Sequence, residues 1–389
     1  MEALPEGDDL LSEILVRLPP QPSSLPRASA VCSRWRSLLT DPAFRRRFRV
    51  HHRRRSAPLL GFFVVHRGVA FHPALDAPDR LPLGRFRLRL DDGYIALGWR
   101  HGLGLFLLPA QLQVLVWDPV AGHQHRLAVP PDLEFRGAKG AAVSGAVLPA
   151  AGDVDHFRVV LVGRDGKQPR TALACVYSSD TGVWGDCVVS AQIPSEGLFV
   201  FRSQPAVLAG DCLHWSVTVD GSRSILEFDL GAQSLHLRLL PGDYYTPLSP
   251  VAFMVMRAEG GGEGFLFLYR FTAELWSTKR NRDGVEIWAP TRDIQLDELL
   301  GLHSEIEPPE MIGYAEENNV AFFRTAEADY MVHLDTLQFK KLPKTSLGSY
   351  YHPLEAFYTP GISGGNERVE DVKQSWWTQL ARYTKQLLG

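Results

Sequence analysis

The chain has 389 residues, enough for two or three domains, and its 45% apolar and 22% charged residues are typical of a globular protein, which excludes a disordered or fibrous class. No run approaches the ~18 apolar residues of a membrane span, and the acidic N-terminal segment lacks the apolar stretch of a secretory signal. We therefore expect no membrane association and a location in the cytoplasm, the nucleus or both. The net charge of −3 is uneven, because residues 1–55 carry 11 arginines against 6 acidic residues.

The first fifty residues predict a small helical module with more apolar surface than it can bury. Asp8 or Asp9 can cap a first helix, which ends near Leu18 because prolines follow it. Ser23 or Ser24 can cap a second helix that ends at Asp41-Pro42. The apolar stripes consist of Leu10, Leu11, Ile14, Leu15, Leu18, Leu25, Ala28, Val31, Cys32, Trp35, Leu38 and Leu39. Segments of ~40 residues rarely bury enough surface to be stable alone, so the excess predicts a protein partner.

The order of landmarks in this module resembles an F-box. These landmarks are Leu4-Pro5, Ile14-Leu15, Leu18-Pro19, Val31-Cys32-x-x-Trp35 and Asp41-Pro42-x-Phe44. The resemblance implies docking on the Skp adaptor of a cullin–RING ubiquitin ligase, and through it on a cullin. The docking residues that it implies are Leu4, Pro5, Ile14, Leu15, Leu18, Pro19, Val31, Cys32 and Trp35. The alternative is an ordinary helical hairpin that packs on the rest of this chain.

A basic run follows, with arginines from Arg45 to Arg55. Such a run can serve as a nuclear-import signal or a nucleic-acid patch. Phe48 is the one Phe, Tyr or Trp in this run, which is too few for a base-stacking surface, so nucleic-acid binding is not expected. The alternative is a solvated helix end, where the helix dipole favours cations.

After residue 55, short β-rich runs separated by Gly, Pro and Asp turns replace the helical stripes. Residues 294–300 are the one short helix that we expect in this region. Groups around Trp117, Tyr177, Phe228, Trp276 and Leu334 repeat at intervals of about 50 to 60 residues, which suits the four-stranded blades of a β-propeller. A sixth blade can come from residues 59–71, with residues 354–358 supplying its missing strand and closing the ring. The alternative is a β-sandwich with irregular loops.

A second, more diffuse resemblance covers the β region. The stretches YSSDTGVW at residues 177–184, ILEFDL at 225–230 and FYTPG at 357–361 resemble the F-box-associated propeller region of plant F-box proteins. The resemblance implies the architecture and no ligand residue. The expected fold is therefore α+β and multidomain: a small helical F-box, an all-β propeller of about six blades, and a C-terminal helix.

We expect four segments along the chain. Residues 1–50 form the helical domain, 51–58 a basic linker, 59–361 the propeller that recognises a substrate, and 362–389 a linker and an amphipathic helix. That last helix carries Trp376 on its apolar stripe. We expect it to lie back on the F-box or the propeller; the alternative is binding to a partner or to a membrane surface.

Motifs for catalysis, phosphate binding or metal binding are absent from the sequence, so we expect no cofactor, no metal and no catalytic residue. The four cysteines show no C-x-x-C pair and are expected to be reduced core residues. Cys175 and Cys187 flank a predicted turn and can meet across strands, but the expected compartment argues against a disulfide.

Loops on the propeller faces are the expected place for ligand recognition. Two pairs of aromatic residues are candidates for substrate binding, Tyr244 with Tyr245 and Tyr350 with Tyr351, because tyrosines are common anchors in protein interfaces. Packing between blades is the competing interpretation for both pairs.

The sequence therefore predicts a non-catalytic receptor that recruits a target protein to an SCF-type (Skp–cullin–F-box) ubiquitin ligase. Two alternatives stay open. One is a propeller that binds a carbohydrate or small molecule, and the other is a propeller enzyme. The enzyme requires polar side chains that converge on the channel with shifted pKa values.

Overall fold

The structure is a computed structural model that describes residues 7–52, 56–66, 68–90, 93–133, 143–149, 156–168, 170–193, 199–201, 204–240, 252–280, 286–302, 307–345 and 350–358. The chain divides into two compact units, Met1–Thr359 and Pro360–Gly389. The second unit holds the predicted C-terminal helix and lies outside the described residues. The predicted domain boundaries near residues 50, 58 and 361 stay predictions.

Four helices form the N-terminal module: α1 (Gly7–Leu15), α2 (Ser24–Ser29), α3 (Ser33–Thr40) and α4 (Pro42–His52). The second helix, predicted from Ser23 or Ser24 to Asp41-Pro42, is in fact two helices, because Cys32 has an extended backbone (φ −160°, ψ 170°) that separates α2 from α3. Neither Gly nor Pro marks this break in the sequence.

The Asp41-Pro42 pair has two roles. Asp41 takes an extended conformation, as residues before proline usually do, and this ends α3. Pro42 then opens α4, where its missing N–H costs nothing, and the Asp41 carboxylate accepts a hydrogen bond from the Ala43 N–H at 3.1 Å. The prediction that the pair ends a helix is confirmed, and the same pair also begins the next one.

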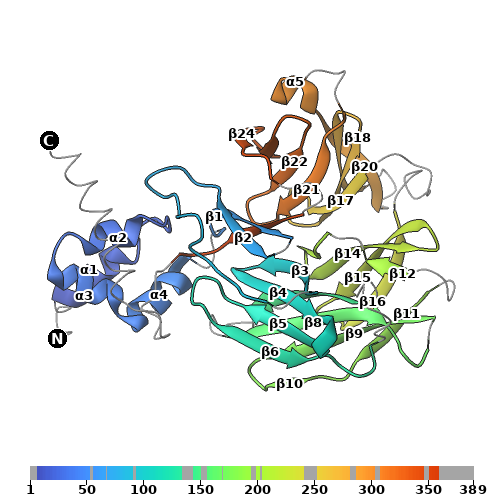
Figure 1. Cartoon of the computed structure of the whole chain (residues 1–389), viewed down its shortest axis with the longest axis horizontal. Helices are drawn as coiled ribbons and strands as arrows, with labels where there is room; N and C mark the ends of the chain where they lie inside the picture. Colours follow the sequence, from blue (N-terminus) through green and yellow to red (C-terminus); the bar gives the residue numbers. More distant parts are fainter. Residues whose placement is uncertain are drawn as a thin grey trace. The chain divides into compact units, whose positions relative to one another are not determined.

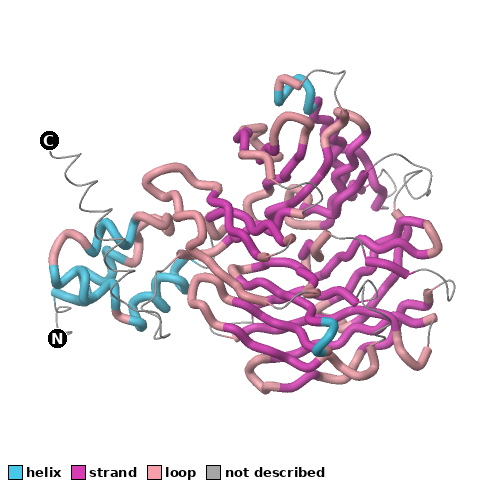
Figure 2. The backbone as a smooth tube through the Cα atoms, viewed as in Figure 1, coloured by secondary structure: helices cyan, strands magenta, loops and turns pink. Residues whose placement is uncertain are grey.

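The remaining elements are nearly all strands, which are magenta in Figure 2, whereas helices are cyan. Four sheets are separate blades, and their strand orders are β3-β4-β5-β6, β10-β9-β8-β7 with β11 also on β9, β12-β14-β15-β16 with β13 also on β14, and β17-β18-β19-β20. These strands are β3 (Ile95–Arg100), β4 (Leu103–Leu108), β5 (Gln113–Trp117), β6 (Gln124–Ala128), β7 (Val143–Pro149), β8 (Phe157–Arg164), β9 (Thr171–Ser178), β10 (Val183–Trp184), β11 (Val188–Gln192), β12 (Phe199–Phe201), β13 (Val207–Ala209), β14 (Cys212–Val219), β15 (Ser222–Asp229), β16 (Ser234–Leu239), β17 (Ala252–Arg257), β18 (Glu263–Tyr269), β19 (Thr272–Arg280) and β20 (Glu286–Gln295). We number these blades 1 to 4 in chain order.

The fifth sheet has the order β2-β1-β25-β21-β22-β23-β24 and contains two blades. Its strands are β1 (Leu59–Val65), β2 (Val69–Pro73), β21 (Glu310–Ala315), β22 (Val320–Arg324), β23 (Asp329–His333), β24 (Phe339–Leu342) and β25 (Tyr351–Glu355). Only one parallel bridge, Gly313 to Tyr351, joins β21 to β25 among the described residues. The strands β21 to β24 are therefore blade 5, and β25, β1 and β2 are blade 6. The predicted propeller of about six blades is confirmed (Figure 1).

The ring closes by pairing strands from opposite ends of the β region. β25 runs antiparallel to β1, with Leu59 opposite Glu355 and Val64 opposite Tyr351. The closing strand was predicted at residues 354–358 and lies three residues earlier. Phe62 of β1 is 1% exposed and its ring stacks on that of Tyr351, with a centroid distance of 4.2 Å.

Between neighbouring blades, apolar side chains form continuous clusters, because the inner strands are buried on both faces. One cluster joins blades 1 and 2, one joins blades 2 and 3, and one joins blades 4 and 5. The predicted helix at residues 294–300 is shorter: Ile294 belongs to β20, and α5 spans Leu296–Leu300.

Two expectations about cysteines differ from the structure. Cys175 and Cys187 form a disulfide in blade 2, whereas we expected both to be reduced. Adjacent residues pair across β9 and β11, with Ala174 opposite Val188, and this register brings the two cysteines together. Cys32 and Cys212 are free, and Cys32 is exposed rather than a core residue.

Candidate docking surfaces

Three large apolar side chains stand out from the helical module. Leu10 and Ile14 of α1 are 57% and 53% exposed, and Val31, between α2 and α3, is 62% exposed. Leu10 and Ile14 are four residues apart and therefore lie on one face of α1. These exposed fractions refer to the whole chain, so the β region does not cover these side chains. We call Leu10, Ile14 and Val31 the apolar patch.

The structure separates the predicted docking residues into different environments. Ile14, Pro19, Val31 and Cys32 are exposed, and Leu18 and Trp35 are half-buried against the core of the module. Leu15 is 1% exposed and packs inside that core with residues such as Phe44 and Phe48, so it is a core residue of the module. Leu4 and Pro5 lie outside the described residues.

Ion pairs fix the helices that carry the apolar patch. Arg34 of α3 lies 2.5 Å from Asp8 of α1, which brings the Val31 end of α3 beside the first turn of α1. Arg47 of α4 forms an ion pair with Glu13 of α1 and also donates to the Ser12 hydroxyl at 3.1 Å. Part of the basic run therefore braces the module, while residues 53–55 of the run lie outside the described part of the chain.

Described residues of the module also contact the β region. The Ser23 N–H donates to Asp79 Oδ1 at 2.9 Å. His52, fully buried at the end of α4, lies 3.0 Å through its Nε2 from the Val16 carbonyl oxygen, and its ring centroid lies 6.2 Å from that of Phe357. Neither contact involves the apolar patch.

Inside the propeller, a polar network joins four blades. Arg100 of β3 donates to both carboxylate oxygens of Glu316, at 2.5 and 2.8 Å, and to the Ala206 carbonyl at 2.8 Å. Glu316 also accepts from the Leu208 N–H at 3.1 Å. Burial alone favours the neutral form of Glu316, but Arg100 outweighs it and lowers the pKa of this carboxyl.

Glu355 of β25 completes the network. It accepts hydrogen bonds from the backbone N–H groups of Glu317 and Asn318 and from the Asn318 side-chain amide, at 3.2, 2.9 and 2.7 Å. Burial, with repulsion from Glu317 and Glu316, raises the pKa of Glu355 to about 8. Polar groups thus do converge near the channel, as the enzyme alternative requires.

The described space beside these groups is small. The cavity between Trp99, Tyr350, Glu316 and Glu355 measures about 20 Å³, and a cavity of this size holds roughly one water molecule. The carboxylates are also occupied by Arg100, Asn318 and backbone N–H groups. This network therefore ties blades 1, 3, 5 and 6 together.

Of the two tyrosine pairs predicted to bind a substrate, the second lies among the described residues. Tyr244 and Tyr245 lie outside the described residues. Tyr351 is fully buried, and Tyr350 lines the small channel cavity with its hydroxyl 3.8 Å from Met254 Sδ. The structure favours packing between blades for Tyr350 and Tyr351 over an exposed binding site.

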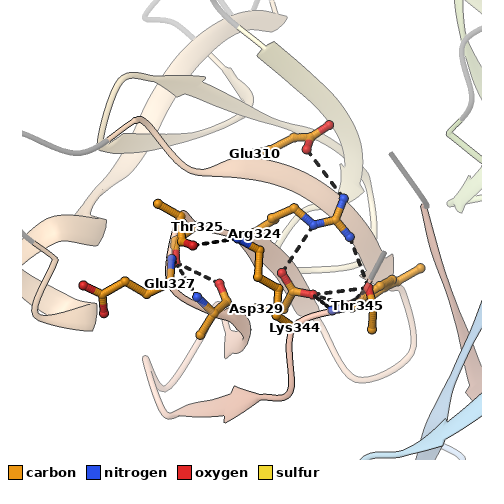
Figure 3. A network of polar contacts seen from close by, with 10 residues as sticks. Glu310, Arg324, Thr325, Glu327, Asp329, Lys344 and Thr345 are labelled. Atoms are coloured by element: carbon orange, nitrogen blue, oxygen red, sulfur yellow. Dashed lines mark hydrogen bonds and ion pairs between the residues drawn. The ribbon is translucent and has the colours of Figure 1, made fainter. Parts of the chain in front are cut away.

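Figure 3 shows a polar network at one end of blade 5 that includes Arg324, Asp329 and Thr345. The Tyr351 hydroxyl also belongs to this network. This hydroxyl donates to Asp329 Oδ2, and Asp329 Oδ1 accepts from Arg324 Nε at 3.3 Å. Thr345 connects the groups, because its N–H donates to Asp329 Oδ2 at 3.1 Å and its hydroxyl lies 2.6 Å from that of Tyr351. Burial raises the pKa of Tyr351, so the phenol stays protonated and keeps its role as donor.

One cluster of potential metal ligands was not predicted from the sequence. His214, Glu227 and Glu263 lie together on β14, β15 and β18. Arg238 of β16 already binds both carboxylates, at 2.5 and 2.7 Å, and this guanidinium supplies the positive charge that a metal would bring. Burial opposes ionisation of Glu263, but His214 and Arg238 lower its pKa. The cluster is an ion network between blades 3 and 4, which pairing across strands creates and the sequence does not display.

Comparison with known proteins identifies the helical module. Residues 1–51 match the F-box-like family model, so this module is an F-box-like domain. An F-box/kelch-repeat protein of Arabidopsis thaliana is 24% identical over 251 residues, which is 60% of this chain and 64% of the length of that relative. Both findings confirm the resemblance to plant F-box proteins with a propeller-like C-terminal region.

Solved structures similar to the chain are distant. TolB from Acinetobacter baumannii has a TM-score of 0.41 and 10% identity, covering 80% of this chain and 72% of its own. The WD40 domain of SCAP from fission yeast has a TM-score of 0.34 and 13% identity, covering 68% and 56%. A luciferin-regenerating enzyme has a TM-score of 0.37 and 10% identity, covering 64% and 77%. The propeller assignment rests on the strand pairing described above.

Proposed function

We propose that this chain, which carries an F-box-like domain followed by a β-propeller, is the substrate-recognition subunit of an SCF-type ubiquitin ligase. The F-box-like domain binds a Skp-type adaptor, and the propeller binds a target protein. The chain performs no chemistry. It places lysines of the target near a ubiquitin-loaded enzyme carried by the cullin arm, which raises their effective concentration.

The observation that supports this proposal best is the apolar patch. Its three side chains are more than half exposed, although large apolar side chains on a folded surface usually have a partner when they gather. The three residues of the patch lie within residues 1–51, the segment that matches the F-box-like family. Within the described residues no helix is long and apolar enough to cross a membrane.

Co-purification with a Skp adaptor tests the proposal. The variant Ile14→Asp with Val31→Asp places two charges in the apolar patch, so we expect adaptor binding to be lost while the fold stays intact. The matched control is Val50→Asp on α4, where Val50 is 48% exposed but lies outside the patch. Leu15 is unsuitable for this test, because its substitution would unfold the module.

Two results would contradict the proposal. The first is an intact protein that retains no adaptor, and the second is equal retention by the patch variant and the Val50 control. We also propose that the protein works in the cytoplasm or the nucleus, where such ligases act, and a fluorescent fusion expressed in plant cells tests this location.

A further inference from the structure

A groove of about 420 Å³ lies on the propeller where blade 4 meets the segment that enters blade 5. Its described lining residues are Ala252, Leu268, Tyr269, Arg270, Pro308 and Pro309. The volume lies within the range of ligand sites, roughly 300–1,000 Å³, and far above the single-water cavity of the channel.

The groove opens on the end of the propeller opposite the F-box-like domain. The chain enters β1 from this domain at Leu59, and Leu59 pairs with Glu355 at the end of β25. Because β21 runs parallel to β25, the start of β21 lies at the other end of the ring. Pro308 and Pro309 immediately precede β21, so the groove faces away from the adaptor-binding helices.

The floor of the groove is apolar and its walls are rigid. Leu268 is 4% exposed and Pro309 is buried, whereas Tyr269 is 49% exposed and Pro308 is exposed. Tyrosine and proline lose little conformational entropy when a ligand packs on them. An apolar side chain that entered the groove would thus find a preformed surface of the kind that anchors protein interfaces.

Arg270 is the one charged side chain among the described lining residues. It occupies the hairpin turn between β18 and β19, is exposed, and forms no ion pair or hydrogen bond with any residue that the structure describes. Other arginines of the β region, such as Arg100 and Arg238, are bound by two carboxylate oxygens. Glu307 is not among the lining residues. The groove therefore combines apolar surface with one unpaired guanidinium.

We propose that this groove binds an extended segment of the target protein in which an apolar side chain stands next to a carboxylate. The apolar side chain packs between Tyr269 and the two prolines, and the carboxylate pairs with Arg270. A single guanidinium favours a carboxylate over a phosphate, because sites for phosphorylated segments use clusters of arginines. This inference rests on the proposed function and names the chemistry of its target.

Fluorescence polarisation with the full chain bound to its adaptor tests the inference. The probes are labelled peptides of about 12 residues, built of Gly and Ser around a central pair, which is Leu-Asp, Leu-Asn, Leu-Lys or Leu-phosphoserine. We expect the Leu-Asp peptide to bind most tightly. Tyr269→Ala and Arg270→Glu should each weaken it by about tenfold, as expected for the loss of one anchoring contact. Arg270→Glu should also shift the preference to Leu-Lys.

Blade 5 offers matched controls on β24. Phe339 is 47% exposed, close to the exposure of Tyr269, and Lys341 is an exposed cation outside the groove. Phe339→Ala and Lys341→Glu should leave peptide binding unchanged. The inference fails if no peptide binds, if phosphoserine or lysine is preferred by the intact protein, or if groove and control variants behave alike. Adaptor retention by every variant separates such a failure from failure of the proposed function.

Discussion

Arg100 and Glu316 are 216 residues apart in the sequence and form a buried two-point ion pair, with Nε–Oε1 and Nη2–Oε2 distances of 2.5 and 2.8 Å. Their side chains are 4% and 11% exposed. Arg100 ends the inner strand of blade 1, and Glu316 follows the inner strand of blade 5, so the pair spans blade 6. The ion pair therefore links the two blades that flank blade 6, where β25 and β1 close the ring.

Replacing Arg100 by Met should lower the free energy of unfolding by about 3–5 kcal/mol, because the Glu316 carboxylate is left buried without its partner. Chemical denaturation measures this change. Arg126→Met is the control, since Arg126 is exposed and donates to the exposed side chain of Gln111. The double variant Arg100→Met with Glu316→Gln should recover part of the loss. A cost for Arg100→Met no larger than that of the control would show that the pair does not support the ring.

Glu355 should make the stability depend on pH. Burial raises its folded-state pKa to about 8, above the ordinary value of 4.5. The folded protein therefore binds more protons than the unfolded chain between these values. Stability from this group is fully present below about pH 4.5 and is lost as the pH rises to about 8, by at most about 5 kcal/mol.

Glu355→Gln should remove this loss, because the amide keeps one acceptor oxygen, which can take the two bonds from Asn318, and does not ionise. Thermal unfolding between pH 5 and pH 9 compares the stability of the two proteins. The expected loss follows from about 1.4 kcal/mol of stability per unit of pKa shift. His101, Glu316, Glu317 and Arg100 face the same region and are unchanged in the variant. Parallel stability curves for the two proteins would contradict the prediction.

Tyr351→Phe should cost about 1–3 kcal/mol, because it removes the hydroxyl that donates to the fully buried Asp329. The aromatic stacking on Phe62 is retained, so the loss reports the hydrogen bond. Tyr269→Phe is the control with an exposed hydroxyl. The melting temperatures of both variants are compared with that of the parent protein. Equal values for Tyr351→Phe and the parent would mean that Thr345 and Arg324 are sufficient partners for the Asp329 carboxylate.

Gly313→Ala should destabilise the junction between blades 5 and 6. An added Cβ at Gly313 would lie 2.9 Å from both the Cβ and the carbonyl oxygen of Tyr351, closer than packed atoms approach. Overpacking of this kind costs about 1–3 kcal/mol. Gly262→Ala, where no atom lies within 4 Å, is the control. Unfolding by urea compares them, and identical midpoints would exclude strain at this junction.

Local pattern was enough to predict the type of most elements. The spacing of apolar residues marked the helices of the module, and turn residues separated the strands of each blade. The same patterns could not tell Ile14 from Leu15, because both are apolar neighbours on one helix. Packing of α4 through Phe44 and Phe48 decides that Leu15 is buried and Ile14 exposed.

Contacts between distant segments explain what the sequence did not predict. Nothing near Arg100 indicates Glu316, and His214 meets Glu227 and Glu263 only because β14, β15 and β18 lie side by side. The Cys175–Cys187 disulfide was rejected on the expected compartment, although the cross-strand geometry that permits it was foreseen. The groove around Tyr269 and Arg270 likewise combines residues from two blades.

The pairing of β25 with β1 has a consequence during synthesis. β25 leaves the ribosome after every other described strand, so blade 6 lacks its third strand until all the strands of the five other blades have been synthesised. A transcript truncated before residue 351 would encode the helices that face the adaptor without a finished ring. If the proposed function is right, such a fragment would bind adaptor molecules without binding a target protein. It would therefore act as a dominant inhibitor of the intact receptor.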